Sequence, residues 1–171
     1  MALVCSMSDI SSFPLPDVLR RTILDSRVGV HLAVTPEPWY RWLLDGSKSI
    51  ESRFSMNRCA PYEKVHPGDI VLAKNGLVSA AFAAVAVRDI DLTKHPILDL
   101  EEQYSSGIHA DHTFWVDRVN KRFCTLIWAG QCVEFPGFSI DKHDRRGWVV
   151  LREAVRPDHP TTDKVVLLRD P

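Results

Sequence analysis

The chain has 171 residues, of which 45% are hydrophobic and 25% are charged, and its formal net charge is −1. These values are typical of one globular domain with a core of its own. The near-neutral charge excludes a protein that binds polyanions through its overall electrostatics, so any contact with nucleic acid has to be local.

The sequence shows no pattern typical of a membrane span, a secretion signal or a disulfide framework. No apolar run approaches the ~20 residues of a membrane span, and the first residues lack the basic start and long apolar stretch of a secretion signal. The cysteines form no CxxC pair, which argues against a zinc knuckle or a disulfide framework. We therefore expect a cytoplasmic protein with reduced thiols and no contact with a membrane.

The first predicted element is a helix near residues 16–27, because apolar side chains recur there at helical spacing. Residues 28–34 alternate well enough for a strand. His31 in this strand is interpreted as a satisfied histidine at the edge of the core, since no second histidine stands at ligand spacing.

A short helix is predicted at residues 36–45. Thr35 would cap it, and Pro36 would occupy the first helical position. Gly46 fits the left-handed position that commonly closes a helix, because without a Cβ it avoids the steric penalty there. The chain can then reverse and enter a strand at once.

Three charged residues mark the start of that next strand. Ile50 and Phe54 fall on one face, and Glu51 and Arg53 fall on the other, roughly 6.5 to 7 Å apart. Lys48 precedes the strand, where its flexible stem can bring the ammonium beside Glu51. Two interpretations are open: a solvated edge with a surface salt bridge worth ~0 to 1 kcal/mol, or a cleft in which the charges converge.

Residues 55–66 have no period and are predicted as a loop, which places Arg58 beside the exit of the charged strand. A buried strand follows at residues 70–73. Asn75-Gly76 is a strong hairpin signal, so the alanine-rich residues 77–87 are predicted as the antiparallel partner strand, although alanine favours a helix.

In the second half of the chain, a helix is predicted at residues 99–106, closed by Gly107, and residues 135–138 are predicted as a loop. Further strands are predicted at residues 122–132, at residues 147–151 and, in the tail, at residues 165–168. His109 and His112 share the spacing of a helical face, but nothing else in the sequence completes a metal site. We expect neither a metal nor a cofactor.

The charged strand and its approach carry a complete GxKxxExR motif, in the residues Gly46, Lys48, Glu51 and Arg53. The chain around it resembles the ASCH domain, a member of the PUA-like superfamily of small β-barrels. The resemblance extends over about residues 31–153 and includes the turn at residues 67–69 and the segment at residues 144–151. All four motif positions match.

The pattern of elements and the resemblance predict the same fold class. We expect an α+β domain built on a small mixed β-barrel of five or six strands, closed or nearly closed, with two or three flanking helices. The predicted organisation is an N-terminal extension with one helix at residues 1–26, the ASCH-like barrel at 27–154, and a C-terminal tail at 155–171.

The resemblance implies binding of single-stranded RNA, a nucleotide or a nucleoside in a cleft beside the motif strand. There Lys48 and Arg53 would meet phosphate or base-edge acceptors, and Glu51 would orient Arg53 or accept from a base amine. Other candidates around the motif are Trp39, Tyr40, Trp42 and Arg58. For the tryptophans a core position is the alternative, since aromatic residues at helical spacing commonly face a core.

The second hypothesis is an enzyme. Some proteins of this kind hydrolyse acylated cytidine, and others are ribonucleases. Lys48 would stabilise a developing oxyanion or the charge on a phosphate, and Glu51 would act as a general base. The chain departs from the amidohydrolase pattern, because Glu51 stands where those enzymes carry a hydroxyl. Nothing in the sequence predicts an oligomeric state.

Overall fold

The structure is a computed structural model that describes residues 14–140 and 146–155. Its helices are α2 (Asp17–Leu24), α3 (Trp39–Leu44), α4 (Leu98–Ile108) and α5 (His112–Val116). Its strands are β1 (Val30–Val34), β2 (Ile50–Ser55), β3 (Ile70–Asn75), β4 (Leu77–Asp91), β5 (Phe123–Ala129), β6 (Val133–Phe138) and β7 (Trp148–Arg152). No helix in these ranges is both long and apolar enough to cross a membrane.

The strands form one seven-stranded sheet in the order β2-β5-β4-β3-β1-β7, with β6 also paired to β4. β1 and β3 run parallel, and the other paired strands are antiparallel. Parallel neighbours need a crossover connection, and here the crossover contains α3 and β2. The charged motif therefore lies within the connection between two adjacent strands of the sheet.

The 15-residue strand β4 joins the two parts of the sheet. Its first half pairs with β3 and β6, and its second half pairs with β5. The register shifts between Ala84 and Ala86, where an irregularity interrupts the ladder with β5. Such irregularities bend a strand, so β4 can turn from one part of the sheet into the other.

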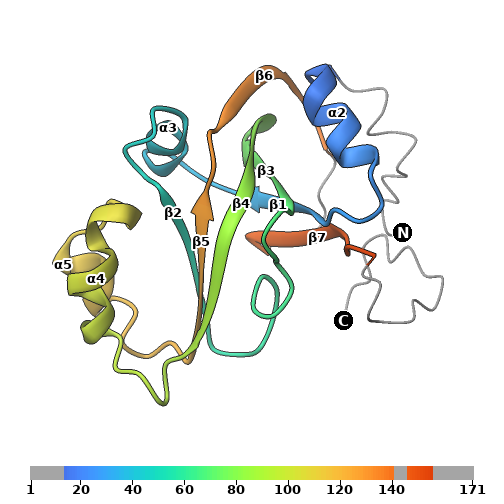
Figure 1. The fold of residues 1–171 in the computed structure, drawn as a ribbon. Coiled ribbons are helices and arrows are strands. Elements are labelled where there is room, and N and C mark those ends of the chain that lie inside the picture. The colour runs from blue at the N-terminus through green and yellow to red at the C-terminus, as the bar shows by residue number, and fades with distance from the viewer. Residues whose placement is uncertain (1–13, 141–145, 156–171) are drawn as a thin grey trace.

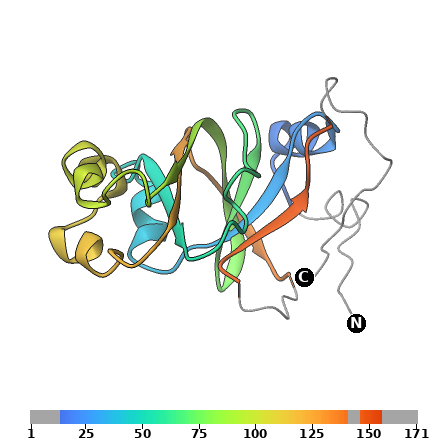
Figure 2. The ribbon, with the colours of Figure 1, turned by 90° about the horizontal axis from the view of Figure 1, so that it is seen from below.

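Helices cover the two ends of this curved sheet (Figures 1 and 2). At one end, α2 packs Leu19 and Ile23, together with the preceding Leu15, into a core shared with β1, β3, β6 and β7. At the other end, α4 and α5 bury a second core against β2 and β5, centred on the fully buried Trp115. Burial of these apolar faces fixes where the helices lie.

The predicted α+β class is confirmed, but the curved sheet does not close into a barrel. The sheet is open, because β2 and β7 end the path without pairing to one another. It also has more strands than the five or six expected. The additional strand is β6, which was predicted as a loop because it contains Pro136. Proline is tolerated at the edge of a sheet, where its missing N–H is not required by a neighbour.

Two helix boundaries differ from those predicted. Helix α3 begins at Trp39 rather than at residue 36, and no side chain caps its start. Glu37 precedes Pro38, and a residue before proline is disfavoured in helical conformation. The other helix, α4, continues through Gly107 to Ile108 and ends at the left-handed residue His109.

Other predictions are confirmed by the structure. Gly76 has a positive φ of 73°, and β3 and β4 form the expected hairpin around it. His31 is buried, with Nε2 3.0 Å from Oδ2 of Asp69 and Nδ1 accepting from the indole of Trp148. It is a satisfied core histidine. The predicted tail strand at residues 165–168 lies outside the described residues.

Candidate functional site: the charge network and the aromatic hollow

Gly46 turns the chain from α3 into β2. Its φ is 79°, as predicted for the residue that closes the helix, and a Cβ there would meet nothing within 4 Å. The tight reversal lets the backbone N–H of Lys48 donate to the carbonyl of Trp42 at 2.8 Å. The need for glycine is therefore conformational, because a left-handed backbone is costly for most L-residues.

Lys48, Glu51 and Arg53 form a charge network inside the protein. The Nζ of Lys48 lies 3.4 Å from Oε2 of Glu51, and Nε of Arg53 donates to Oε1 of Glu51 at 2.7 Å. Lys48 also donates to the carbonyl of Ile108 at 3.3 Å. Burial lowers the pKa of Lys48, although the neighbouring carboxylate of Glu51 acts in the opposite direction.

Arg53 connects the two ends of the open sheet. From β2 its guanidinium donates to the carbonyl of Val34 at 2.9 Å and to the carbonyl of Gly147 at 3.1 Å. Val34 ends β1 and Gly147 directly precedes β7, while the guanidinium carbon lies 5.3 Å from the ring centroid of Trp148. One side chain thus bridges a gap that backbone pairing leaves open.

The side chains of this network are more buried than expected for the polar face of β2. The exposed fractions of the side chains are 3% for Lys48, 5% for Glu51 and 21% for Arg53. The exposed-edge interpretation is therefore wrong, because the C-terminal end of α4 packs over the start of β2. The structure shows Lys48 paired with Glu51 and the carbonyl of Ile108, and Glu51 paired with Lys48 and Arg53, so both side chains are engaged inside the protein.

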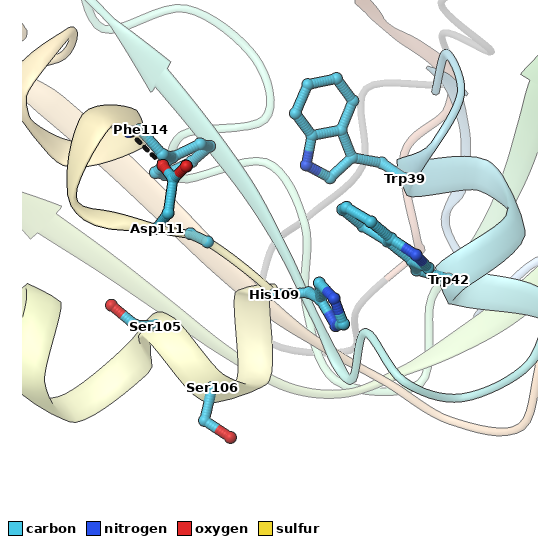
Figure 3. Close-up of a pocket in the computed structure, with 8 residues that line it drawn as sticks. Trp39, Trp42, Ser105, Ser106, His109, Asp111 and Phe114 are labelled. Carbon is cyan, nitrogen blue, oxygen red and sulfur yellow. Dashed lines mark hydrogen bonds between the residues drawn. The ribbon is translucent and has the colours of Figure 1, made fainter.

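A hollow of about 540 Å³ lies next to the network, between α3 and the turn from α4 to α5 (Figure 3). We call it the aromatic hollow. Its lining residues are Trp39, Trp42, Ser105, Ser106, His109, Ala110, Asp111 and Phe114. The volume is within the range of about 300 to 1,000 Å³ that small-molecule sites commonly have.

Two tryptophans form the α3 side of the aromatic hollow. Trp39 and Trp42 are both half-buried, and their rings meet edge to face at 6.4 Å and 84°. Trp42 stacks on the imidazole of His109, with centroids 4.0 Å apart. The tryptophans therefore do not occupy the core, which was the alternative for them, and their ring surfaces border open space.

The opposite side of the hollow is shaped by the turn between α4 and α5. His109 has φ 62° and ψ 50°, a left-handed conformation that is uncommon for a residue other than glycine. Asp111 caps α5 by accepting from the backbone N–H of Phe114 at 2.9 Å. Lys48 is hydrogen-bonded to the start of this turn, since its acceptor, the carbonyl of Ile108, directly precedes His109.

The remaining predicted candidates lie elsewhere. Tyr40 is buried, packs against Ala73 and Ala80, and its hydroxyl hydrogen-bonds to Ser79, so it offers no stacking face. Arg58 follows the far end of β2, where its guanidinium lies over the rings of Tyr62 and Phe123. Neither residue lines the aromatic hollow.

Sequence reasoning missed His109, Asp111 and Phe114 as lining residues. The signals were present, because Asp111 is a good helix-capping residue and the two histidines around it had drawn attention. What the sequence did not reveal was the meeting of this turn with α3. The turn meets α3 where His109 stacks on Trp42, and α4 approaches β2 closely at Gly107, where a Cβ would lie 2.5 Å from Cδ1 of Ile50.

The fold and the site define an α+β domain with an open curved sheet, a buried charge network and an aromatic hollow beside it. In comparisons by sequence, no family model matches the chain and no curated protein gives a significant match. Comparison by structure does find proteins with a similar fold.

The crystal structure of ASCH from Zymomonas mobilis superposes with a TM-score of 0.57 at 11% identity, covering 75% of this chain and 90% of that chain. A mutant of the same Zymomonas mobilis protein gives a TM-score of 0.56 at 10% identity, covering 75% and 92%. A second mutant also gives 0.56 at 10% identity, covering 72% and 90%. The protein therefore has an ASCH-like fold, as the motif resemblance predicted.

Proposed function

We propose that the protein binds single-stranded RNA, a nucleotide or a nucleoside, and that the aromatic hollow receives the base. The observation that carries this proposal is the pair of half-buried tryptophans, Trp39 and Trp42, at the edge of a hollow of about 540 Å³. Single-stranded bases commonly bind by stacking on aromatic side chains, and every base has a face that can stack. The ASCH-like fold is consistent with this assignment.

The charge network has a supporting role in this proposal. Lys48 and Glu51 are buried and do not line the aromatic hollow, whereas Lys48 is bonded to the turn that forms one of its walls. We therefore assign both residues to positioning rather than to contact with the ligand. Arg53 holds the sheet ends together and uses its guanidinium on carbonyl groups of the protein.

The alternative function is hydrolysis of RNA or of a modified nucleoside. It requires Lys48 or Glu51 to touch the substrate, and the exposed fractions of 3% and 5% leave neither side chain accessible. A general base has to be within hydrogen-bond reach of the proton that it abstracts. The geometry therefore favours binding without turnover as the function of this site.

The test is a calorimetric titration of the full chain with nucleosides, a short single-stranded RNA and a duplex of the same sequence. We expect binding of the single strand and not of the duplex, whose bases are stacked and paired. None of the eight residues that line the hollow is a lysine or arginine, so the affinity should depend only weakly on salt. Mass spectrometry of the mixtures reports any turnover.

Matched variants separate the aromatic hollow from general effects of losing a tryptophan. Trp39→Leu should weaken binding about tenfold, because stacking on an aromatic ring is worth ~1 to 3 kcal/mol per base. Trp128→Leu is the control, since Trp128 packs on Tyr104 and does not line the hollow. Equal affinities for Trp39→Leu and wild type would reject the hollow as the site, and hydrolysed products would reinstate the enzyme alternative.

A further inference from the structure

The aromatic hollow has an unusual charge for a site that receives part of a nucleic acid. Asp111 is the only one of its eight described lining residues with a formal charge when the histidine is neutral. Two cations close to it, Lys48 and Arg118, are engaged elsewhere. Lys48 is buried against Glu51, and Arg118 stacks on the ring of Phe114 at 3.6 Å and donates to the Phe114 carbonyl. The hollow itself therefore offers no cation to a phosphate.

Electron-rich ring faces accompany this single negative charge. In Figure 3 the indoles of Trp39 and Trp42 lie on one side of the hollow, and Asp111 and Phe114 lie on the other. Tryptophan is the side chain that attracts a cation most strongly through its ring face. Arg118 already covers a face of Phe114, and His109 stacks on Trp42, so the attraction for a cation comes mainly from the indole of Trp39.

We infer that the aromatic hollow prefers a nucleobase that carries a positive charge, such as N7-methylated guanine or N1-methylated adenine, over the neutral parent base. This inference rests on the proposed function and names the ligand class of the same site. A charged planar ring can stack on an indole and gain cation–π attraction, while the carboxylate of Asp111 balances its charge. The sugar and any phosphate would lie outside the hollow, in solvent.

The size of the hollow favours a ring over a small ammonium group. At about 540 Å³ it is large enough to take a drug-sized ligand, and its walls on two elements are separated rather than closed into a narrow cage. Three polar side chains besides Asp111 border it, namely Ser105, Ser106 and His109. Of these, Ser105 is already bonded to Trp115 and Glu101, and Nδ1 of His109 lies 3.4 Å from the carbonyl oxygen of Ser47. Ser106 and Nε2 of His109 are left to meet the edge of a base.

The test compares 7-methylguanosine with guanosine in calorimetric titrations of the full chain. The methylated nucleoside should bind about tenfold more tightly, as the range of cation–π energies implies. Asp111→Asn should reduce this ratio to about two or less. Asparagine also caps helices well, so the contact with the backbone of Phe114 is retained while the charge is lost.

Asp117→Asn is the control variant, because it removes the same charge at the other end of α5 and does not line the hollow. It should leave the ratio unchanged. Equal binding of the two nucleosides by wild type would overturn the inference and leave the proposed function standing, whereas failure to bind either nucleoside or RNA would overturn both. Tetramethylammonium that binds as tightly as 7-methylguanosine would overturn the assignment to a base.

Discussion

Replacing Glu51 by glutamine tests how the charge network contributes to stability. The carboxylate holds Nε of Arg53 at 2.7 Å and lies 3.4 Å from Nζ of Lys48, with 5% of the side chain exposed. Glutamine keeps the size and one acceptor oxygen but leaves the buried ammonium of Lys48 without a compensating charge. Breaking a buried pair in this way costs ~3 to 5 kcal/mol in other proteins.

For this protein we expect a cost at or just below the lower end of that range, about 2 to 3 kcal/mol, because Arg53 is partly exposed and keeps its carbonyl acceptors. Urea unfolding of wild type and variant, with an unchanged dependence on denaturant, gives the free-energy difference. Restoring stability by adding Lys48→Met to Glu51→Gln would identify the uncompensated ammonium as the cause.

The matched control is Glu153→Gln, at an ion pair that is closer than Lys48–Glu51 but exposed. The Nζ of Lys64 lies 3.0 Å from Oε1 of Glu153, and about half of each side chain is exposed. Surface pairs of this kind contribute ~0 to 1 kcal/mol. If Glu51→Gln costs no more than Glu153→Gln, burial is not what makes the network important and our reasoning about it fails.

Substitutions at Gly46, Gly107 and Asp69 test the backbone and the buried acid. Gly46→Val should cost ~1 to 2 kcal/mol in urea unfolding, whereas Gly46→Asn should cost less, because asparagine tolerates the left-handed conformation. Gly107→Ala should destabilise by ~1 to 3 kcal/mol, and adding Ile50→Val should not worsen it if their close contact is the cause. Burial raises the pKa of Asp69, but hydrogen bonds from His31 and two backbone amides outweigh it and leave the pKa below the ordinary 3.8. The folded protein then binds fewer protons than the unfolded chain, so the stability advantage of wild type over Asp69→Asn should shrink as the pH falls below 3.8. A constant difference across that range would contradict the assignment.

Local signals in the sequence predicted much of the fold. Gly46 was predicted to close a helix because it has no Cβ, and Asn75-Gly76 was predicted to form a hairpin turn. Both glycines have a positive φ in the structure. The alanine-rich strand β4 was found because the hairpin turn before it outweighed the helical propensity of alanine. These features depend on residues that are close in the sequence.

Features that depend on distant residues were missed. Period-two alternation placed Glu51 on the polar face of β2, but it contains no information on whether another element covers that face. α4 comes from much later in the chain and buries the charges. The aromatic hollow was missed for the same reason, since α3 and the turn at His109 are brought together only by tertiary packing.

The order of strands in the sheet has a consequence for how the molecule assembles. β3 and β4 are joined by the tight hairpin turn at Gly76. They can pair early, because closing a short loop costs little entropy. β2 has to wait for its partner β5, which follows far along the chain, and slow formation of such distant contacts is general. Arg53 then finds Gly147 only when the chain up to β7 has been made. We therefore expect the bridge across the open sheet to be among the last contacts to form, since it requires both ends of the sheet in their native places.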